Sequence, residues 1–585
     1  MSEEKLVNLT IDGIQVSVPE SYTVLEAARK ANIEIPTLCY LKEINEIGAC
    51  RMCLVEIEGM RGLPTSCITK VAEGMVVHTH TEKVVKTRRT VLELLLSNHD
   101  KDCLTCRRNG NCELQKLCEK FNIHDVRFEG ERSRTDTDDL SPSIVRDNGK
   151  CILCRRCTAT CKNVQNICAI ETINRGYESC IGTACDKSLN DVDCILCGQC
   201  IESCPTGALH EKDDSEKVWE ALHDPEKYVV VQTAPAVRVA IGEEFGMPIG
   251  TNAEGKMVTA LKRLGFDKVF DTNTGADFTI VEEATEFVDR LTNGGVLPMI
   301  TSCCPSWIRF AELNYPEDLG HLSSCKSPHQ MFGSIIKTYF ANRNGIDPSK
   351  IVTVSVMPCV AKKYEAAREE MQQENGLRDV DYVISTRELA RMIKQNDIDF
   401  VNLEDSQFED PMGSATGAAA IFGTTGGVME AALRTAADLV EGRDIQEINY
   451  EAVRGEKGIK ETTVTVNGKE IRICVVSGIK NVRKVMDEVH AGNSNYDFIE
   501  VMTCPGGCIM GGGQPIKNSK TRATVDVRKL RSDALYEIDE KSTIRKSHRN
   551  PQVNRIYNEF FGQYGSALAH KYLHTHYSPK PKYRF

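Results

Sequence analysis

Two short runs of cysteine with the same spacing constrain this chain more than any other feature. One spans residues 151–161 and the other spans residues 194–204, and each has the pattern C-x2-C-x2-C-x3-C. The chain has 26 cysteines among its 585 residues, and scattered buried thiols do not repeat at such intervals. A chain with this pattern must fold around bound metal or around disulfides.

The beginning of the chain and its composition help to decide between bound metal and disulfides. The first ten residues, MSEEKLVNLT, have no basic start, apolar run or cleavage site of an export signal, and no stretch approaches the ~18 consecutive apolar residues of a membrane span. We therefore expect a cytoplasmic protein without a membrane segment, whose cysteines are reduced thiols. The net charge of −11 argues against binding of nucleic acid. Iron–sulfur clusters are then favoured over zinc sites and over disulfides.

The two matching runs indicate a pair of four-iron clusters in residues 145–215. Their spacing is that of bacterial ferredoxins with two cubane clusters, in which the fourth cysteine of each run ligates the other cluster. The pattern therefore predicts two interleaved ligand sets. One set comprises Cys151, Cys154, Cys157 and Cys204, and the other comprises Cys194, Cys197, Cys200 and Cys161.

Residues 1–80 have the features of a small domain with a metal site of its own. Hydrophobic residues alternate over 5–18 around Asp12-Gly13, which predicts a β-hairpin, and Thr23 with Glu26 offers a capping box for a short helix. The cysteines that follow resemble the cluster loop of plant-type two-iron ferredoxins, which have a β-grasp fold. A small zinc site is the alternative, although the ten-residue gap after the first cysteine fits it less well. The predicted ligands are Cys39, Cys50, Cys53 and Cys67.

A histidine joins the cysteines in the next segment, residues 81–128. A helix predicted around 85–96 is followed by the spacing H-x3-C-x2-C-x5-C, and one imidazole with three thiolates could equally hold zinc. The segment resembles the four-iron site that follows the ferredoxin domain in iron-only hydrogenases and in the large electron-transfer subunit of respiratory NADH dehydrogenase. Residues 129–144 are polar and turn-rich, which indicates a linker. The predicted ligands are His99, Cys103, Cys106 and Cys112.

Four clusters in series form only an electron relay and do not show which reaction is catalysed. That reaction must be inferred from the region beyond residue 215. Up to residue 210 the chain could equally begin a subunit of NADH dehydrogenase or a formate dehydrogenase. From Tyr228 strands and helices alternate, with helices predicted near 253–264 and 279–291 and a buried strand at 351–356. We expect a two-lobed α/β domain over residues 216–520, and thus a multidomain α+β and α/β chain.

Three motifs in this domain together resemble the signature motifs of iron-only hydrogenases. They are TSCCPSW at 301–307, MPCVAKKYE at 357–365 and EVMTCPGGCIMGGGQP at 500–515. The resemblance runs from the N-terminus to the end of the chain, and it implies reversible, heterolytic oxidation of H2 at a six-iron group. One of the matched cysteines, Cys508, also bridges in the family to a two-iron centre with carbon monoxide, cyanide and a dithiolate bridge. The implied cubane ligands are Cys304, Cys359, Cys504 and Cys508.

The same resemblance assigns the walls of the active site. Lys362 matches a lysine that pairs with a cyanide, and Met357 and Met502 match methionines that pack against a carbonyl. Two positions depart from the common pattern. Ala236 replaces the serine of many members and Ser306 replaces a glycine, but neither position supplies a metal ligand. The other residues matched to the wall are Ala234, Pro235, Ala236, Pro328 and His329.

A proton path is also implied by the resemblance. Cys303 matches the thiol that exchanges protons with the dithiolate amine, and the path continues to solvent through the positions of Glu283, Ser323 and Glu286. A chain of polar groups suits heterolytic splitting of H2, because each proton must leave without crossing apolar protein. The spacing of the two glutamates by itself indicates only a solvated helix face. Six cysteines fit no ligand set and are expected to be buried small residues: Cys118, Cys168, Cys180, Cys185, Cys325 and Cys474.

Residues 521–585 are basic and have a helical pattern. They resemble the small subunit that some hydrogenases encode separately. The histidines of this segment, His570, His574 and His576, are expected at the surface or in packing. The chain has no G-x-G-x-x-G motif, and Gly511–Gly513 belong to the third motif. Chemistry of NAD(P) must therefore lie on a partner.

The whole layout most resembles the catalytic subunit of multimeric, NAD(P)-linked cytoplasmic hydrogenases, including the NADP-reducing enzyme. The implied cofactors are one two-iron cluster, three four-iron clusters in the relay and the six-iron group. The implied partners are H2, protons and NAD(P)-reducing flavoprotein or iron–sulfur subunits in a hetero-oligomer, or ferredoxin. The alternatives are an electron-transfer subunit of a dehydrogenase complex, a hydrogen sensor and an assembly scaffold. An electron-transfer subunit has no use for the three motifs, and sensors tend to lose the thiol that Cys303 retains.

Overall fold

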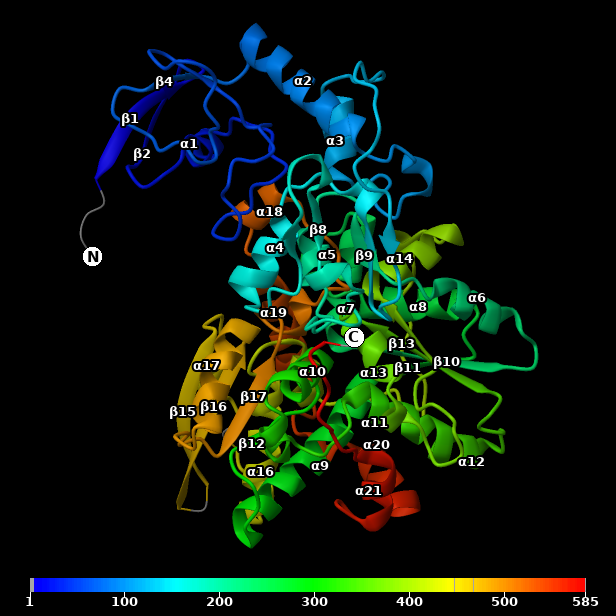
Figure 1. Ribbon diagram of the computed structural model, residues 1–585. Coiled ribbons are helices and arrows are strands. Elements are labelled where there is room, and N and C mark those ends of the chain that lie inside the picture. The colour runs from blue at the N-terminus through cyan, green and yellow to red at the C-terminus, as the bar shows by residue number, and fades with distance from the viewer. Residues whose placement is uncertain (1–4, 447, 467, 584–585) are drawn as a thin grey trace.

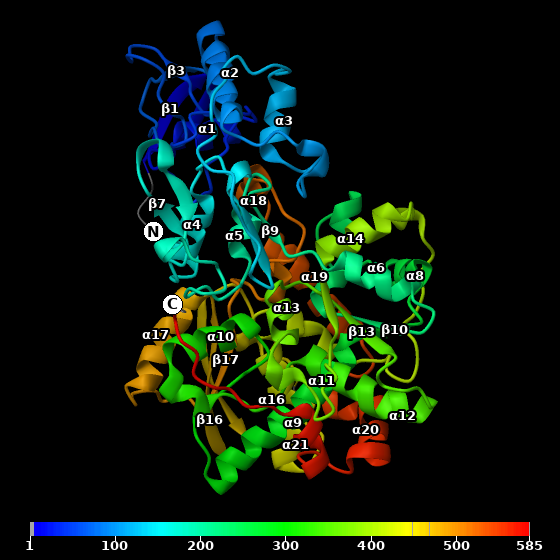
Figure 2. The ribbon, with the colours of Figure 1, turned by 45° about the vertical axis from the view of Figure 1, so that its right-hand side comes forward.

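The computed structural model describes residues 5–446, 448–466 and 468–583, so residues 1–4 and 584–585 of the first and last predicted domains lie outside it. The N-terminal domain lies at one end of an elongated molecule, and the two sheets of the large domain lie at the other end (Figures 1 and 2). The segment 145–215 lies between them. Among the described residues, no helix is both long enough and apolar enough to span a membrane.

The predicted hairpin and capped helix are both present in the N-terminal domain. Asp12 and Gly13 form the turn of the hairpin, with positive φ angles of 49° and 84°. The following helix begins at the capping box of Thr23 and Glu26. The hairpin belongs to a four-stranded sheet of order β2-β1-β4-β3. The elements are β1 (Leu6–Ile11), β2 (Ile14–Pro19), α1 (Val24–Lys30), β3 (Glu56–Ile57) and β4 (Val76–His78).

The sheet of the middle domain begins inside the predicted linker, 129–144. β5 (Thr137–Asp138) pairs with β6 (Ile144–Asp147), which pairs in turn with β9 (Leu209–Glu211). The polar sequence does not predict these strands. Buried Ser141 Oγ accepts hydrogen bonds from the backbone amides of Ser143 and Ile144, so these amides do not need water. The other elements of residues 81–215 are α2 (Glu82–Ser97), α3 (Glu113–Lys120), α4 (Arg156–Ala159), β7 (Glu171–Ile173), β8 (Cys180–Gly182) and α5 (Gln199–Ser203).

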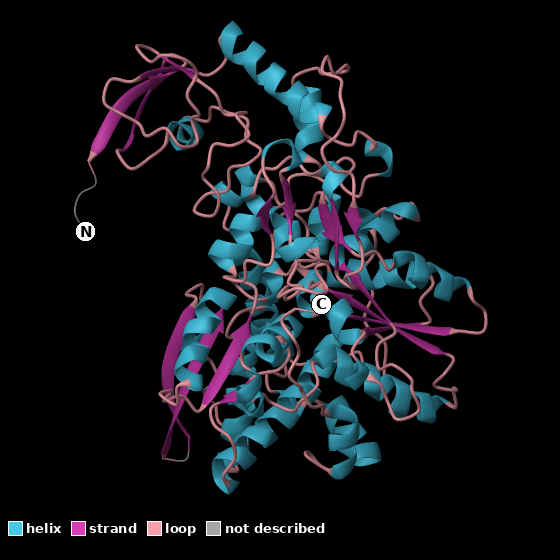
Figure 3. Ribbon diagram, viewed as in Figure 1, coloured by secondary structure: helices cyan, strands magenta, loops and turns pink. Residues whose placement is uncertain are grey.

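The large domain contains two four-stranded sheets with helices between and around them (Figure 3). All neighbouring strands are parallel in the first sheet, of order β11-β10-β13-β14. In the second sheet, of order β12-β17-β16-β15, only the last pair is antiparallel. The alternation predicted from Tyr228 onward is therefore confirmed. The strands are β10 (Tyr228–Thr233), β11 (Lys268–Asp271), β12 (Met299–Ile300), β13 (Ile351–Met357), β14 (Tyr382–Ser385), β15 (Ile459–Val466), β16 (Lys469–Ser477) and β17 (Phe498–Met502).

One long helix, α9 (Thr272–Asn293), joins the cores of the two lobes. Its Phe278 and Val281 pack in a core with α11 and the first sheet, whereas its Ile280 and Phe287 pack in a core with α16 and the second sheet. This shared helix holds the two sheets in a common frame. The other helices of the domain are α6 (Ser215–His223), α7 (Pro235–Arg238), α8 (Glu254–Leu264), α10 (Pro305–Asn314), α11 (Pro328–Ile335), α12 (Ala341–Asn344), α13 (Ala361–Ala366), α14 (Thr386–Gln395), α15 (Gly417–Ala420), α16 (Gly427–Glu441) and α17 (Ile479–His490).

The C-terminal segment is helical, as predicted, and it contributes to the core. Val553, Ile556 and Leu573 are buried in the same cluster as residues of α9 and α11. The segment runs along the molecule from the N-terminal domain to the far end of the large domain (Figure 1). Its helices are α18 (Ser519–Thr524), α19 (Val527–Lys541), α20 (Pro551–Ile556) and α21 (Ala567–Leu573).

Candidate functional site

The two sheets bring the ends of five strands to one cavity. The segments that follow β10, β11, β12, β13 and β17 all contribute residues to its lining. A crevice beyond the carboxyl ends of parallel strands is the usual ligand site of α/β folds. All three signature motifs supply residues to this cavity.

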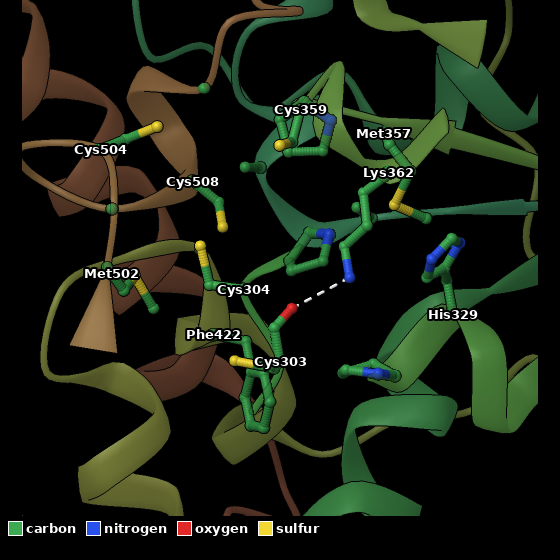
Figure 4. A pocket seen from close by; sticks show the side chains of 18 of the residues that line it. Cys303, Cys304, His329, Met357, Cys359, Lys362, Phe422, Met502, Cys504 and Cys508 are labelled. Carbon is green, nitrogen blue, oxygen red and sulfur yellow. Dashed lines mark hydrogen bonds between the residues drawn. The ribbon is translucent and has the colours of Figure 1, made fainter. Parts of the chain in front are cut away.

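Four cysteines reach the cavity from three distant segments of the chain. Cys304 precedes α10, Cys359 follows β13, and Cys504 and Cys508 follow β17. Figure 4 shows their sulfur atoms pointing toward a common space. The structure thus brings together the four residues to which the resemblance assigns one cubane.

The surroundings of these thiols suit an anionic metal group. Burial raises the pKa of Cys359 to about 12 and also raises the pKa values of Cys504 and Cys508, so the thiols would keep their protons without a bound cation. Thr272, Pro305 and Pro328 also line the cavity, and each is the first residue of a helix. The ends of these helices carry partial positive charge, which favours thiolate-bound clusters. The donor set and its field therefore fit an iron–sulfur group.

Glycines of the third motif allow its backbone to lie against two other loops. A Cβ atom at Gly511 would lie 2.3 Å from the carbonyl oxygen of Pro358, and one at Gly512 would lie 2.6 Å from that of Cys197. Any side chain at these positions would push the loop away. The two glycines are thus needed to hold Cys508 near Cys359 and near the predicted cubane of Cys197.

Lys362 lies in the cavity wall within a buried network of charged groups. Its Nζ donates to the carbonyl oxygen of Cys303 at 3.0 Å, which is the dashed line in Figure 4, and to Glu365 Oε2 at 2.8 Å. Burial lowers the pKa of Lys362, but the Glu365 carboxylate outweighs it and raises the pKa overall. His329 Nε2 lies 2.5 Å from the same Glu365 oxygen, and Ser327 Oγ donates to it at 2.9 Å. Burial, reinforced by the charge of Lys362, lowers the pKa of His329 to about 4, so this imidazole is neutral at pH 7.

The remaining residues that the resemblance assigns to the wall lie together. Ala234, Pro235, Ala236, Pro328, Met357 and Met502 all line the cavity. Ser306, one of the two departures, also lines it, and its buried hydroxyl has no hydrogen-bond partner among the described residues. Sequence reasoning missed Phe422 and Glu365. Glu365 is the last residue of the second motif, but only the fold shows that its carboxylate contacts both Lys362 and His329.

The predicted proton path runs along α9 and the loop before α11. Glu283 is buried, and neither of its carboxylate oxygens has a hydrogen-bond partner within the described part of the chain. Burial, with the nearby charge of Glu286, raises the pKa of Glu283 to about 8. Cys303 and Ser323 both interact electrostatically with Glu283. A solvated helix face, which spacing alone indicated, is therefore wrong for Glu283.

The outer end of the path reaches a half-buried carboxylate. Ser323 Oγ donates to Glu286 Oε2 at 2.9 Å. The other oxygen of Glu286 lies 2.6 Å from Arg290 Nη2. The side chains of Glu286 and Arg290 are each 14% exposed, so this pair is where the path approaches water.

The two interleaved sets of the middle domain also meet in the expected combinations. One cavity is lined by Cys151, Cys154 and Cys157 of the first run together with Cys204 of the second. Another is lined by Cys194, Cys197 and Cys200 together with Cys161. The exchange of the fourth cysteine follows from the packing of the helices that begin within each run, α4 and α5.

The N-terminal domains hold the remaining predicted ligands. Cys39, Cys50, Cys53 and Cys67 are all buried, and Cys53 Sγ lies 3.2 Å from Cys67 Sγ. His99 is buried, and its Nδ1 has no hydrogen-bond partner among the described residues. Burial lowers the pKa of His99 to about 4, which keeps the ring neutral as a metal ligand requires. The accompanying cysteines are Cys103, Cys106 and Cys112, of which only Cys112 is buried.

Contacts between these domains were not visible in the sequence. Asn45 Nδ2 donates to the carbonyl oxygen of Cys39 at 2.7 Å and to that of Cys154 at 3.0 Å, so one side chain joins the first predicted cluster to a cubane. Cys106 lies against Gly207, where a Cβ atom would be 2.5 Å from its Sγ. Both N-terminal domains thus touch the cubane segment that contains Cys154 and Cys204.

The six cysteines without a ligand set do not share one environment. Cys180, Cys325 and Cys474 are buried, as expected. The expectation of burial is wrong for Cys168 and Cys185, which are exposed, and Cys118 is only half-buried. Cys168 and Cys185 have positive φ angles of 58° and 53°, so they lie in turns at the surface.

Models of five protein families match the chain in the order of its domains. The match over residues 227–512 is described as "Iron only hydrogenase large subunit, C-terminal domain". The others are "2Fe-2S iron-sulfur cluster binding domain" over residues 4–82, "NADH-ubiquinone oxidoreductase-G iron-sulfur binding region" over 88–127, "4Fe-4S binding domain" over 189–210 and "Iron hydrogenase small subunit" over 525–580.

Curated relatives match over nearly the whole length. "NADP-reducing hydrogenase subunit HndD" of Solidesulfovibrio fructosivorans is 48% identical over 98% of this chain and 99% of its own. "Iron hydrogenase 1" of Clostridium pasteurianum is 45% identical over 97% of this chain and 99% of its own. Among solved structures, an apo FeFe-hydrogenase HydA1 variant from Chlamydomonas reinhardtii is 40% identical, with a TM-score of 0.56 over 63% of this chain and 99% of its own.

Proposed function

Because the chain belongs to the iron-only hydrogenase family, we propose that it splits and forms H2 heterolytically at a six-iron group held in the cavity at the strand ends. The observation that carries this proposal is the convergence of Cys304, Cys359, Cys504 and Cys508 on one cavity that also contains Cys303 and Lys362. An electron-transfer subunit would need neither the thiol nor the buried lysine. A hydrogen sensor would not need a complete proton path.

Different residues of the cavity would hold the six-iron group and form its surroundings. When bound, the six-iron group supplies the metal centre at which H2 is cleaved. The four cysteines would hold its cubane, and Cys508 is the residue that would also hold its two-iron part. Lys362, held by Glu365, offers an ammonium to an anionic ligand, and Met357 and Met502 form apolar walls that keep water away.

Protons travel between this site and water over the chain's own polar groups. The Cys303 thiol passes a proton to or from Glu283, which with its raised pKa is protonated at neutral pH. Ser323, which interacts electrostatically with Glu283 and donates to Glu286, would then connect the two carboxylates, and Arg290 holds Glu286 at the surface end.

Electrons travel through one two-iron and three four-iron clusters in the N-terminal half. The segment 145–215, which would hold two cubanes, lies between the large domain and the distal domains of Cys39 and His99. The contacts of Asn45 with Cys39 and Cys154 support direct communication along this series. Electron transfer of this kind needs close contact between the segments that hold successive clusters.

The electron acceptor is a separate subunit that reduces NAD(P), or else ferredoxin. The name of the relative from Solidesulfovibrio fructosivorans, an NADP-reducing hydrogenase subunit, supports the first, as does the absence of a G-x-G-x-x-G motif in this chain. We propose a cytoplasmic hetero-oligomer, in which this chain carries out the H2 chemistry and its partner the nucleotide chemistry.

Production with and without the enzymes that assemble the two-iron centre tests the proposal. Chain made without them should bind cubanes but neither oxidise nor evolve H2, because no amino acid replaces the two-iron centre. Chain made with them should be active with a redox dye in both directions. Full turnover by the first preparation, or none by the second, would overturn the proposal.

A further inference from the structure

A histidine of the C-terminal segment forms hydrogen bonds on both sides of its ring. His574 Nδ1 lies 2.8 Å from Ser324 Oγ, and its Nε2 lies 2.9 Å from Glu282 Oε2. The residue is only 9% exposed. Sequence reasoning treated it as a surface or packing histidine, but a histidine bonded at both nitrogens has the arrangement of a proton carrier.

Ser324 connects this histidine to the outer end of the proposed proton path. Its hydroxyl lies 3.2 Å from Glu286 Oε2, and its backbone amide donates to the same oxygen at 3.1 Å. Hydrogen-bonded groups therefore run without a break from Glu286 through Ser324 and His574 to Glu282. This series leaves the path at Glu286.

The partners of the histidine determine which way a proton can move. Glu282 is a buried carboxylate that accepts hydrogen bonds from Tyr557 OH and from the Gly565 amide, the latter at 3.1 Å. A carboxylate at Nε2 favours the tautomer with its proton there, which leaves the Nδ1 lone pair free to receive a proton from Ser324. The same carboxylate stabilises the imidazolium that results.

His574 packs against a second histidine and lies among several titratable groups. The ring of His570, an exposed residue on α21, lies over it with ring centroids 4.2 Å apart. The titratable groups around this point are Glu282 and Glu286 of α9, Cys325, Tyr557 and His570, and Arg290 neutralises Glu286 on its far side.

We propose that His574 is a proton-accepting residue that gives the proton path a second branch, into the small-subunit-like tail and ending at Glu282. The inference rests on the proposed function, because it extends the path that ends at Glu286. One proton moves and no electron: Glu286 releases it to Ser324 Oγ, and the hydroxyl proton of Ser324 passes to His574 Nδ1. The imidazolium then gives its Nε2 proton to the Glu282 carboxylate, and Ser324 rotates back.

The test compares four variants of the iron-loaded, full-length chain. His574→Gln removes the acceptor, and Ser324→Ala removes only the bridging hydroxyl. His576→Gln changes an exposed histidine two residues away and serves as the matched control. Glu286→Gln interrupts the path before it divides. The measurements are kcat for dye-linked H2 oxidation across the pH range, its solvent deuterium isotope effect, the iron content and the melting temperature.

We expect His574→Gln and Ser324→Ala to lower kcat by about 3–10-fold, less than the ~10²-fold typical of a sole proton-transfer group, because the Arg290 side remains open. Both should remove the same titration step from the pH profile and raise the isotope effect, which a purely structural role would not do. His576→Gln should match the unaltered chain. If His574→Gln fails to fold or to hold iron, Ser324→Ala decides the question alone.

The outcomes separate this inference from the proposed function. Wild-type kcat and pH profile in both His574→Gln and Ser324→Ala, together with a large loss in Glu286→Gln, would overturn the second branch and leave the main path intact. Full activity in Glu286→Gln would instead show that the proposed path itself is wrong.

Discussion

Gln199 Nε2 donates one hydrogen bond to Cys504 Sγ at 3.3 Å and another to the carbonyl oxygen of Met510 at 2.8 Å. Gln199 lies between Cys197 and Cys200 of a predicted relay cubane, whereas Cys504 belongs to the predicted active-site cubane. A hydrogen bond to a cluster sulfur raises the reduction potential, because it stabilises the negative charge that reduction adds. The contact therefore joins the last step of the relay to the active site.

Gln199→Leu should lower the reduction potential of the active-site cubane by about 20–60 mV, the equivalent of one net hydrogen bond of about 0.5–1.5 kcal/mol. A redox titration followed by electron paramagnetic resonance measures the shift. Gln165→Leu is the matched control, since Gln165 is buried and bonds to the carbonyl of Thr503 at 3.1 Å but to no sulfur. An equal shift in both variants would contradict the assignment.

Glu365→Gln should destabilise the large domain by about 3–5 kcal/mol, because Lys362 would remain buried without its carboxylate. Burial alone would raise the pKa of Glu365, but Lys362 and His329 hold it at about 2. The carboxylate therefore stabilises the fold fully above the unfolded-state pKa of ~4.3, and this contribution is lost as the pH falls toward 2. The midpoint of urea unfolding, followed by circular dichroism at pH 7, measures the change.

The double variant Lys362→Met with Glu365→Gln is the control for this interpretation. Removing both charges should recover most of the lost stability, although not the H2 activity. A double variant that unfolds as easily as Glu365→Gln alone would show that the loss does not arise from an unpaired lysine.

The pH dependence of proton reduction should follow Glu283. Burial and then the charge of Glu286 raise its pKa to about 8, so it carries a proton to deliver at lower pH and lacks one at higher pH. The rate of H2 evolution with a reduced dye should therefore fall as the pH rises through about 8, whereas H2 oxidation should not. Glu283→Gln should lower both rates by ~10²–10⁴-fold. An unchanged profile in Glu283→Gln would exclude this residue from the path.

Electrons from an NAD(P)-linked partner should enter through the N-terminal domain. Cutting away residues 1–130 is a poor test, because buried Arg156 would lose its bidentate pairing with Glu113 at 2.8 and 3.0 Å. Cys50→Ala instead removes one predicted ligand of the first cluster. It should leave dye-linked H2 oxidation unchanged and eliminate NAD(P)-coupled turnover in the reconstituted complex. Coupled turnover that persists in Cys50→Ala would mean that the partner delivers electrons elsewhere.

Sequence reasoning finds features whose residues lie close together along the chain, and it misses contacts between residues that lie far apart. Cysteine spacing is local, and it indicated which thiols gather around the two cavities of the middle domain, including the exchange of Cys161 and Cys204, whereas the active-site set came from the family resemblance. Helix and hairpin signals at Thr23 and Asp12 are local as well. The bridge from Asn45 to Cys154 and the contact of His574 with Glu282 span 109 and 292 residues. Such contacts depend on how whole domains pack, and the periodicity of hydrophobic residues does not predict domain packing.

The most direct test of the central claim separates ligand from proton carrier at two neighbouring positions. Cys303→Ala should retain the iron of the unaltered chain and lose turnover by ~10²–10⁴-fold, because only proton transfer is removed. Cys304→Ala should lose iron from the active-site cubane as well as activity. Iron content and dye-linked H2 turnover, measured on both variants after full assembly, decide the matter. Equal iron loss in the two variants, or an active Cys303→Ala enzyme, would contradict the account.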